Sequence, residues 1–181
     1  APLLTYKEKI ELFKVVREAV GNRGHVIAGT GGNETVEAVE MTRDAQEIGC
    51  DASMLVVPYY NKPPQDLIYK HFKMVAEVSR KIPIILYNIP GRTAVNMLPE
   101  TVVKLAEEFP NINAIKEASG SIDQIMEIRR MTNNRMKIFS GDDCMTLPIL
   151  SIGGHGLISV SSHVVGNELK QMIKSYVAGD V

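Results

Sequence analysis

The side chain best suited to chemistry in this sequence is Lys116, close to the end of the apolar run 112–117. A lysine at the end of a buried strand can point into the mouth of a barrel, where loss of solvation disfavours the ammonium. The free amine can then attack a ketone and form a Schiff base. The alternative is a solvated lysine at a strand end, with no chemical role.

Two further side chains can assist such an amine. Tyr87 ends the apolar run 84–86, and its phenol can relay a proton to or from an imine. Arg92 follows Pro90 and Gly91, which favour a turn, and its guanidinium can hold a carboxylate through two hydrogen bonds. An amine, a proton relay and a carboxylate clamp together suit a 2-oxo acid. Taken singly, Tyr87 also fits a core tyrosine and Arg92 a surface arginine.

A glycine-rich segment at residues 29–33 offers a different chemistry. It follows an apolar run and precedes a helical pattern, as a dinucleotide-binding loop does. Glu34 stands where that motif has its third glycine, and an acidic residue at a helix start repels a pyrophosphate. A nucleotide- or phosphate-binding α/β domain is the alternative from a different functional class, and Glu34 argues against it.

Two adjacent pairs of residues also follow apolar runs. Neighbouring strand residues point to opposite faces, so Tyr59 and Tyr60 are expected to have different functions. Asp142 and Asp143 are expected to cap the helix that follows, because no other metal-ligand residues lie nearby in the sequence.

Composition excludes several functional classes. The 181 residues are 45% hydrophobic and 23% charged, which suits one folded domain rather than disorder. A net charge of -1 argues against a nucleic-acid partner, and no run of about 18 apolar residues predicts a membrane span. Two cysteines and four scattered histidines lack metal-ligand spacing, so we expect no metal ion and no other cofactor. Free thiols and the lack of a visible leader predict a cytoplasmic protein.

The elements that must position these residues alternate along the chain. Six short and mostly continuous apolar runs predict strands of a parallel sheet covered on both faces, at residues 25–30, 53–58, 83–88, 112–117, 136–140 and 156–160. Apolar stripes predict helices before, between and after them, at residues 12–20, 38–48, 68–76, 102–109 and 169–177, of which the last is the clearest amphipathic helix.

Local signals support the helix starts. Thr5 with Glu8, and Ser121 with Gln124, have the spacing of capping boxes. Pro99 falls where a first-turn proline is tolerated.

The spacing of the strands favours a barrel. They begin about 20 to 30 residues apart, and nearly every one ends in polar or glycine-rich residues. A (β/α)₈ barrel brings all strand ends to one face, whereas a doubly wound sheet gathers its functional residues at one switch point. A complete barrel requires eight strands, so residues 1–181 are expected to form a single partial (β/α)₈ barrel domain.

Six segments, in this order, resemble the dihydrodipicolinate synthase family, within the superfamily that includes N-acetylneuraminate lyase. They are residues 28–31, 58–63, 87–93, 115–118, 140–143 and 156–160. The resemblance implies a class I, Schiff-base lyase that condenses pyruvate with L-aspartate-4-semialdehyde to give 4-hydroxy-tetrahydrodipicolinate in lysine and diaminopimelate biosynthesis. Another pyruvate-dependent aldolase of the superfamily, or an inactive fragment, is the alternative.

The resemblance also implies roles for individual residues. Lys116 would form the imine with pyruvate, Tyr87 would be the central proton relay, and Tyr60 would complete that relay in a neighbouring subunit. Arg92 would hold the carboxylate of the aldehyde, and superfamily members acting on sugar acids usually lack this arginine. Gly141 and Ile158 would line the pocket near the lysine. A homodimer or homotetramer is implied.

Regulation by lysine is a further implication. The family's inhibitory site at the dimer interface matches Asn33, Glu37 and Tyr59. Two histidines that complete it in sensitive bacterial members correspond here to Tyr6 and Lys9. The ammonium of Lys9 would repel the amine of the ligand, so feedback inhibition is not expected.

Both ends of the chain depart from the family pattern. The family's Gly-Thr-Thr-Gly-Glu stretch on its second strand, whose threonines contact pyruvate and relay protons, would lie immediately before residues 1–5. That stretch, the first strand and a C-terminal helical segment are absent. The chain is therefore expected to hold strands 3 to 8 of the barrel and to be a cut or processed form that begins at Ala1. It is also expected to lack the threonines of the proton relay.

Overall fold

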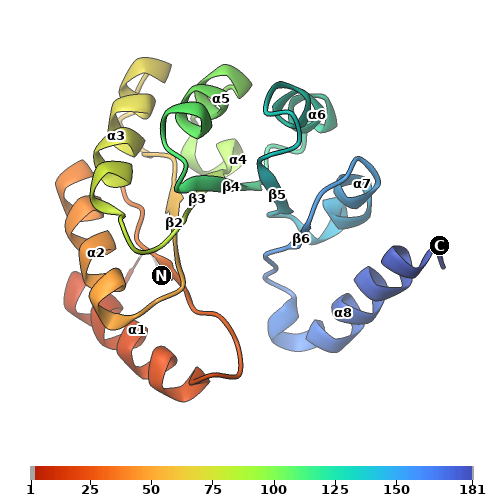
Figure 1. The fold of residues 1–181 in the computed structure, drawn as a ribbon, viewed down its shortest axis with the longest axis horizontal. Helices are drawn as coiled ribbons and strands as arrows, with labels where there is room; N and C mark the ends of the chain where they lie inside the picture. Colours follow the sequence, from red (N-terminus) through yellow and green to blue (C-terminus); the bar gives the residue numbers. More distant parts are fainter. Residues whose placement is uncertain (1–2, 181) are drawn as a thin grey trace.

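The computed structural model describes residues 3–180, which form an arc of parallel strands with helices on its outer side (Figure 1). The expected domain ends, Ala1, Pro2 and Val181, lie outside the described residues. No helix in the described range is long and apolar enough to cross a membrane.

Six strands form one sheet, and every neighbouring pair is parallel. They are β1 (Ile27–Gly29), β2 (Ala52–Val56), β3 (Ile84–Asn88), β4 (Ile112–Glu117), β5 (Lys137–Ser140) and β6 (Gly156–Leu157). Their order in the sheet is their order in the sequence, with no reversal. A doubly wound sheet requires a switch point, so the sequential order confirms the prediction of an incomplete (β/α)₈ barrel.

Helices precede the first strand, connect the strands and follow the last one. They are α1 (Tyr6–Val20), α2 (Thr35–Ile48), α3 (Gln65–Val78), α4 (Pro90–Thr93), α5 (Pro99–Glu108), α6 (Ile122–Met131), the 3₁₀ turn η1 (Asp143–Met145), α7 (Thr146–Ser151) and α8 (Ser162–Ala178). The predicted capping box of α1 is confirmed, because Thr5 accepts from the Glu8 amide and the Glu8 carboxylate accepts from the Thr5 amide. Pro99 occupies the first turn of α5, as predicted.

Several predicted strands are shorter than expected, and the first, β1, covers only Ile27–Gly29 of the predicted residues 25–30. Strand β2 ends at Val56 because Pro58 has no N–H group to donate to a ladder. The prediction of a strand over 156–160 was wrong beyond Leu157. The Asp143 carboxylate accepts hydrogen bonds from the amide and hydroxyl of Ser161, at 3.2 and 2.8 Å, which turns the chain away from the ladder.

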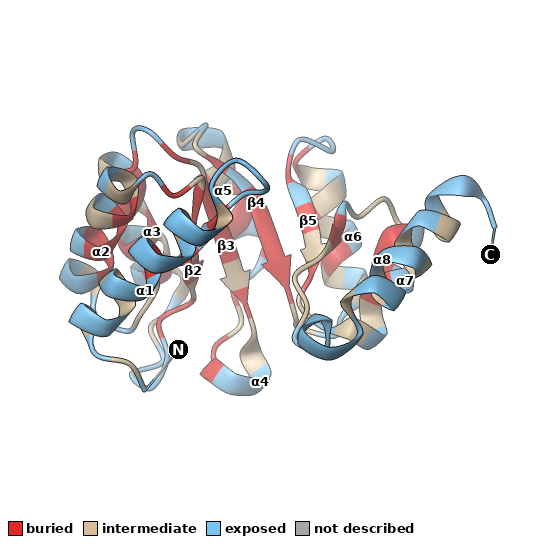
Figure 2. Ribbon diagram, turned by 90° about the horizontal axis from the view of Figure 1, so that it is seen from below, coloured by how far each residue is buried: buried red, intermediate tan, exposed pale blue. Residues whose placement is uncertain are grey.

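The core lies mainly between the sheet and the outer helices. The largest fully buried side chains there include Phe72, Leu86 and Ile115. Figure 2 shows this as buried segments along β2, β3 and β4, beside the largely exposed α1 and α8. A smaller cluster on the inner face contains Ala52, Ile85 and Ala114. The packing therefore holds the middle strands most firmly, and the predicted chemistry lies on two of them.

Candidate active site

The carboxyl ends of β3 and β4 bring Tyr87 and Lys116 together. These residues are register partners in the parallel ladder, and Val56 is the partner of Tyr87 on the other side. Side chains in register on neighbouring strands point to the same face of a sheet. Ala114 and Ile85, two positions earlier on these strands, belong to the inner cluster, so Tyr87 and Lys116 also face the inside of the arc.

Lys116 is buried, with 7% of its surface exposed. Its Nζ lies 4.3 Å from the centroid of the Tyr87 ring. Burial lowers the pKa of the Lys116 ammonium, and the negative charge of Asp143 partly opposes that effect. A buried amine with a lowered pKa is the form of lysine that attacks a carbonyl carbon.

Gly141 leaves the space that the lysine side chain occupies. A Cβ at residue 141 would lie 3.0 Å from Cε of Lys116 and 2.8 Å from Cβ of Ala118. The Gly141 amide donates to the Glu117 carbonyl at 2.8 Å, which fixes it beside β4. Ile158 follows β6, and its amide donates to the Ser140 carbonyl at 2.9 Å. Both predicted pocket residues thus lie next to the end of β5, and Gly141 also lies close to the Lys116 side chain.

Tyr87 is half-buried, and burial raises the pKa of its phenol, while the charge of Arg92 lowers it slightly. The ring lines a cavity of about 470 Å³ that Arg92 also lines. A phenol with a raised pKa keeps its proton near neutral pH, so it can donate that proton and take it back.

Arg92 lies on α4, a single helical turn rather than the loop that the sequence suggested. Pro90 is compatible with the first turn of that helix, and the Thr93 hydroxyl donates to the Ile89 carbonyl at 3.0 Å. Ala94 ends the turn in the left-handed conformation, with φ of 56°. The exposed guanidinium is therefore carried on a short rigid turn beside the cavity (Figure 2 shows α4 beyond the ends of the strands).

The two adjacent tyrosines occupy different environments. Tyr59 lines the same cavity as Tyr87 and Arg92. Tyr60 is 89% exposed and has a φ of 70°. Their surroundings therefore differ, and the expectation of different functions stays a prediction. The strand alternation offered as its reason was wrong, because both residues lie after the end of β2.

Apart from Tyr59, which follows β2, the residues matched to a lysine-binding site lie near the start of α1 and α2. Nζ of Lys9 is 3.6 Å from a carboxylate oxygen of Glu37, and Lys9 also lines the cavity. The Tyr6 hydroxyl donates to the Asp44 carboxylate at 2.8 Å. Asn33 is exposed just before α2. Lys9 therefore already pairs with Glu37, one of the residues that the resemblance assigns to the lysine-binding site.

The glycine-rich segment does not form a phosphate cradle. The Glu34 carboxylate caps α2 by accepting from the amides of Val36, at 2.9 Å, and Glu37. These are the amides that a phosphate would use at a helix N-terminus. Gly31 serves packing, because a Cβ there would lie 2.4 Å from the Val56 amide nitrogen. The geometry thus disfavours the nucleotide-binding alternative.

The aspartate pair has two separate structural functions. The Asp142 carboxylate accepts from the Cys144 amide at 3.0 Å and caps η1, as predicted. Asp143 instead contacts Ser161, across the ends of β5 and β6, and its Oδ1 is buried with no hydrogen-bond partner among the described residues.

The sequence did not identify a polar network behind Lys116. The buried Glu117 carboxylate accepts from the side-chain amides of Asn88 and Gln124. The Ser121 hydroxyl accepts from the Gln124 amide at 3.2 Å, but the Gln124 side chain turns to this network instead of completing the capping box. The prediction that the Gln124 side chain completes the capping box at Ser121 was therefore wrong. The one sequence signal that could have indicated the network is the acidic residue Glu117 at the end of an apolar strand, next to Lys116.

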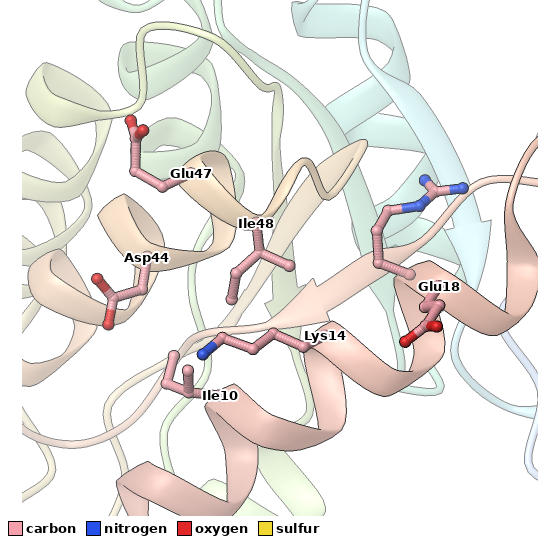
Figure 3. Close-up of a pocket in the computed structure, with 7 residues that line it drawn as sticks. Ile10, Lys14, Glu18, Asp44, Glu47 and Ile48 are labelled. Atoms are coloured by element: carbon pink, nitrogen blue, oxygen red, sulfur yellow. The ribbon is translucent and has the colours of Figure 1, made fainter.

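A separate hollow lies between α1 and α2 (Figure 3). Its volume is about 570 Å³, and charges of both signs line it, including Lys14, Glu18 and Asp44. Opposite charges on two exposed helices are typical of a solvated surface. None of the residues predicted to do chemistry lines this hollow.

Comparison with known proteins identifies relatives over the entire sequence. The model of the Dihydrodipicolinate synthetase family matches residues 1–181. A 4-hydroxy-tetrahydrodipicolinate synthase of Cyanothece sp. is 51% identical over 181 residues, which are 100% of this chain and 61% of the relative. The corresponding enzyme of Thermosynechococcus vestitus is 51% identical over 180 residues, covering 99% of this chain and 60% of its own length.

Solved structures agree with these relatives. A dihydrodipicolinate synthase of Aquifex aeolicus superposes with a TM-score of 0.96 at 45% identity, covering 99% of this chain and 61% of that one. The enzyme of Cyanidioschyzon merolae, solved with lysine bound, superposes with a TM-score of 0.94 at 50% identity, covering 97% and 59%. The chain therefore spans about 60% of the length of the relatives it matches.

Proposed function

Because the chain belongs to the dihydrodipicolinate synthetase family, we propose that it carries the imine-forming centre of a 4-hydroxy-tetrahydrodipicolinate synthase. The reaction would condense pyruvate with L-aspartate-4-semialdehyde, within lysine and diaminopimelate biosynthesis, in a cytoplasmic homodimer or homotetramer. The observation that carries this proposal is the buried Lys116 amine beside the Tyr87 ring.

The first step forms a covalent bond between the chain and pyruvate. The neutral amine of Lys116 attacks the C2 carbonyl carbon, and the resulting carbinolamine loses one molecule of water to give the imine. The Tyr87 phenol supplies a proton to the departing hydroxyl and recovers it later. Burial raises the pKa of the phenol, so Tyr87 keeps its proton at neutral pH and is in the form that can donate it, and no cofactor is needed.

Two other residues act on the second substrate and on the neighbouring copy. Arg92 would hold the carboxylate of the aldehyde, which the shared cavity with Tyr87 supports. Tyr60 would complete the proton relay of a second subunit, and its 89% exposure is consistent with that function. Gly141 and Ile158 would shape the pocket near the imine.

Borohydride reduction in the presence of pyruvate tests the proposal. Reduction converts the imine to a stable amine, so peptide mass mapping of the protein at its natural length should find the adduct on Lys116. Lys116→Arg should yield none, and Lys137→Arg on the neighbouring strand is the matched control. An unmodified Lys116 in folded protein would refute the proposal.

A second candidate is another pyruvate-dependent aldolase with a different aldehyde. The Arg92 side chain favours an acceptor with a carboxylate, because its guanidinium is exposed at the cavity. Parallel assays of pyruvate consumption with L-aspartate-4-semialdehyde and with uncharged aldehydes separate the two. If the chain traps pyruvate but consumes no aldehyde, the alternative of an inactive form is correct.

A further inference from the structure

The Glu117 carboxylate is buried at the end of β4, with 1% of the residue exposed. It accepts from the Ser119 amide at 2.8 Å, from Asn88 Nδ2 at 3.2 and 3.3 Å, and from Gln124 Nε2 at 3.3 Å. In the part of the chain that the structure describes, every group that contacts this carboxylate is a neutral donor. Burying a carboxylate without a cationic partner destabilises the fold, and an apolar side chain of similar size would occupy this space with a smaller loss of folding free energy.

The network reaches the segment that follows the Arg92 turn. Asn88 Nδ2 also donates to Oδ1 of Asn96 at 2.8 Å, and Oδ1 of Asn88 accepts from the Met97 amide at 3.0 Å. Asn96 Nδ2 donates to Oε1 of Gln124 at 2.7 Å. Three elements, β3, the segment between α4 and α5, and the start of α6, therefore converge behind β4.

This network is directly coupled to the imine-forming centre through the strand register. Asn88 pairs with Glu117 in the ladder, immediately after the pair of Tyr87 and Lys116. Since neighbouring strand residues point to opposite faces, the carboxylate lies on the helix side while the amine lies on the inner side. The carbonyl of Glu117 also accepts from the Gly141 amide at 2.8 Å. Movement of residue 117 would displace both Lys116 and the glycine that makes room for it.

We propose that Glu117 is a positioning residue for the imine-forming lysine. It would hold the ends of β3 and β4 in the register that places Lys116 against Tyr87, through its hydrogen bonds to Asn88 and Gln124. This inference rests on the proposed function of Lys116, and it adds a residue on the opposite face of the strand.

The test is Glu117→Gln in the protein at its natural length. The new amide group opposes the amide donors around it, and small displacements of reacting groups cost up to about a hundredfold in rate. We expect kcat to fall about tenfold to a hundredfold while the KM for pyruvate stays within about twofold. The pH profile of borohydride trapping at Lys116 should shift as well. Glu127→Gln, the same change on the surface of α6, is the matched control and should leave kcat, the KM for pyruvate and the pH profile unchanged.

A compensating variant separates positioning from mere loss of stability. In the double variant Glu117→Gln and Gln124→Glu, the new amide faces a carboxylate again, so we expect kcat to recover at least threefold over Glu117→Gln alone. If Glu117→Gln does not fold, Gln124→Ala removes one donor from a half-buried position and should lower kcat severalfold.

The outcomes distinguish this inference from the proposed function. A wild-type protein that forms no adduct with pyruvate would overturn both. A wild type that forms the adduct, with a folded Glu117→Gln or Gln124→Ala variant of unchanged kcat and pH profile, would overturn the positioning function alone. Failure of the double variant to recover any activity would also count against it.

Discussion

Gly141 and Lys116 lie so close that only a residue without a side chain fits at position 141. A Cβ there would lie 3.0 Å from Cε and 3.2 Å from Cγ of the lysine. The lysine lies on β4, and the glycine follows β5, the next strand in the sheet. The position of the amine therefore depends on the backbone of a neighbouring strand as well as its own.

Gly141→Ala should displace Lys116 and weaken the fold. The extra methyl group would also lie 2.8 Å from Cβ of Ala118, which cannot rotate away. Overpacking of this kind costs about 1–3 kcal/mol, measured as the free energy of unfolding in denaturant. Trapping of pyruvate should slow at least tenfold, because the amine moves. Gly32→Ala, where no atom lies within 4 Å of the new Cβ, is the control; equal effects of both variants would contradict this account.

The sequence predicted the fold and the proximity of two candidate residues because these depend on local patterns. Continuous apolar runs marked the six strands, and polar strand ends favoured a barrel over a doubly wound sheet. Lys116 and Tyr87 were candidates from residue type and strand position alone, and the register confirms their proximity.

The remaining features depend on long-range geometry. The function of Glu117 requires knowing that Asn88 and Gln124, from different elements, turn toward one carboxylate. The shortening of β6 follows from an Asp143 contact to Ser161, 18 residues away in the sequence. The α4 turn is a four-residue helix, too short to have a periodic pattern.

Lys116→Met should stabilise the fold near neutral pH. Burial lowers the pKa of Lys116 in the folded chain, so the unfolded chain binds more protons between that pKa and the ordinary value for lysine. The stability of the wild type therefore rises with pH across this interval, and the advantage of the variant shrinks. Denaturant unfolding of the wild type and of Lys116→Met at pH 7 and pH 10 measures how far their free energies of unfolding differ. Lys137→Met replaces an exposed lysine on β5, and a similar pH-dependent gain there would contradict the prediction.

His71 should make the fold sensitive to acid. Burial lowers the pKa of His71 from 6.5 to about 4, and the charge of Glu34 opposes this. Nδ1 of His71 lies 2.9 Å from the Thr35 hydroxyl, and Nε2 is buried with no hydrogen-bond partner in residues 3–180. As the pH falls below 6.5 the unfolded chain gains a proton that the folded chain does not, so stability is lost down to about pH 4.

The loss attributable to His71 should be about 1–3 kcal/mol. The measurement compares the wild type with His71→Gln by denaturant unfolding at pH 7.5, 5.5 and 4.5. The free energy of unfolding should fall more in the wild type than in His71→Gln as the pH is lowered, so the difference between the two proteins should depend on pH. His163→Gln changes an exposed histidine and serves as the control. A difference that is constant across the three pH values would rule out this titration.

Free lysine should not bind tightly near α1 and α2. The Lys9 ammonium lies 3.6 Å from the Glu37 carboxylate, and the Lys9 side chain is only 18% exposed. A ligand amine would have to displace this internal partner and would be repelled by it, and juxtaposed like charges cost several kcal/mol. Calorimetric titration of the wild type with L-lysine should therefore show no micromolar binding. Lys9→Ala should strengthen binding at least tenfold by freeing Glu37, whereas Lys14→Ala, on the same helix but lining the hollow of Figure 3, should not. Micromolar binding by the wild type, or no gain in Lys9→Ala, would show that the pair with Glu37 does not block the site.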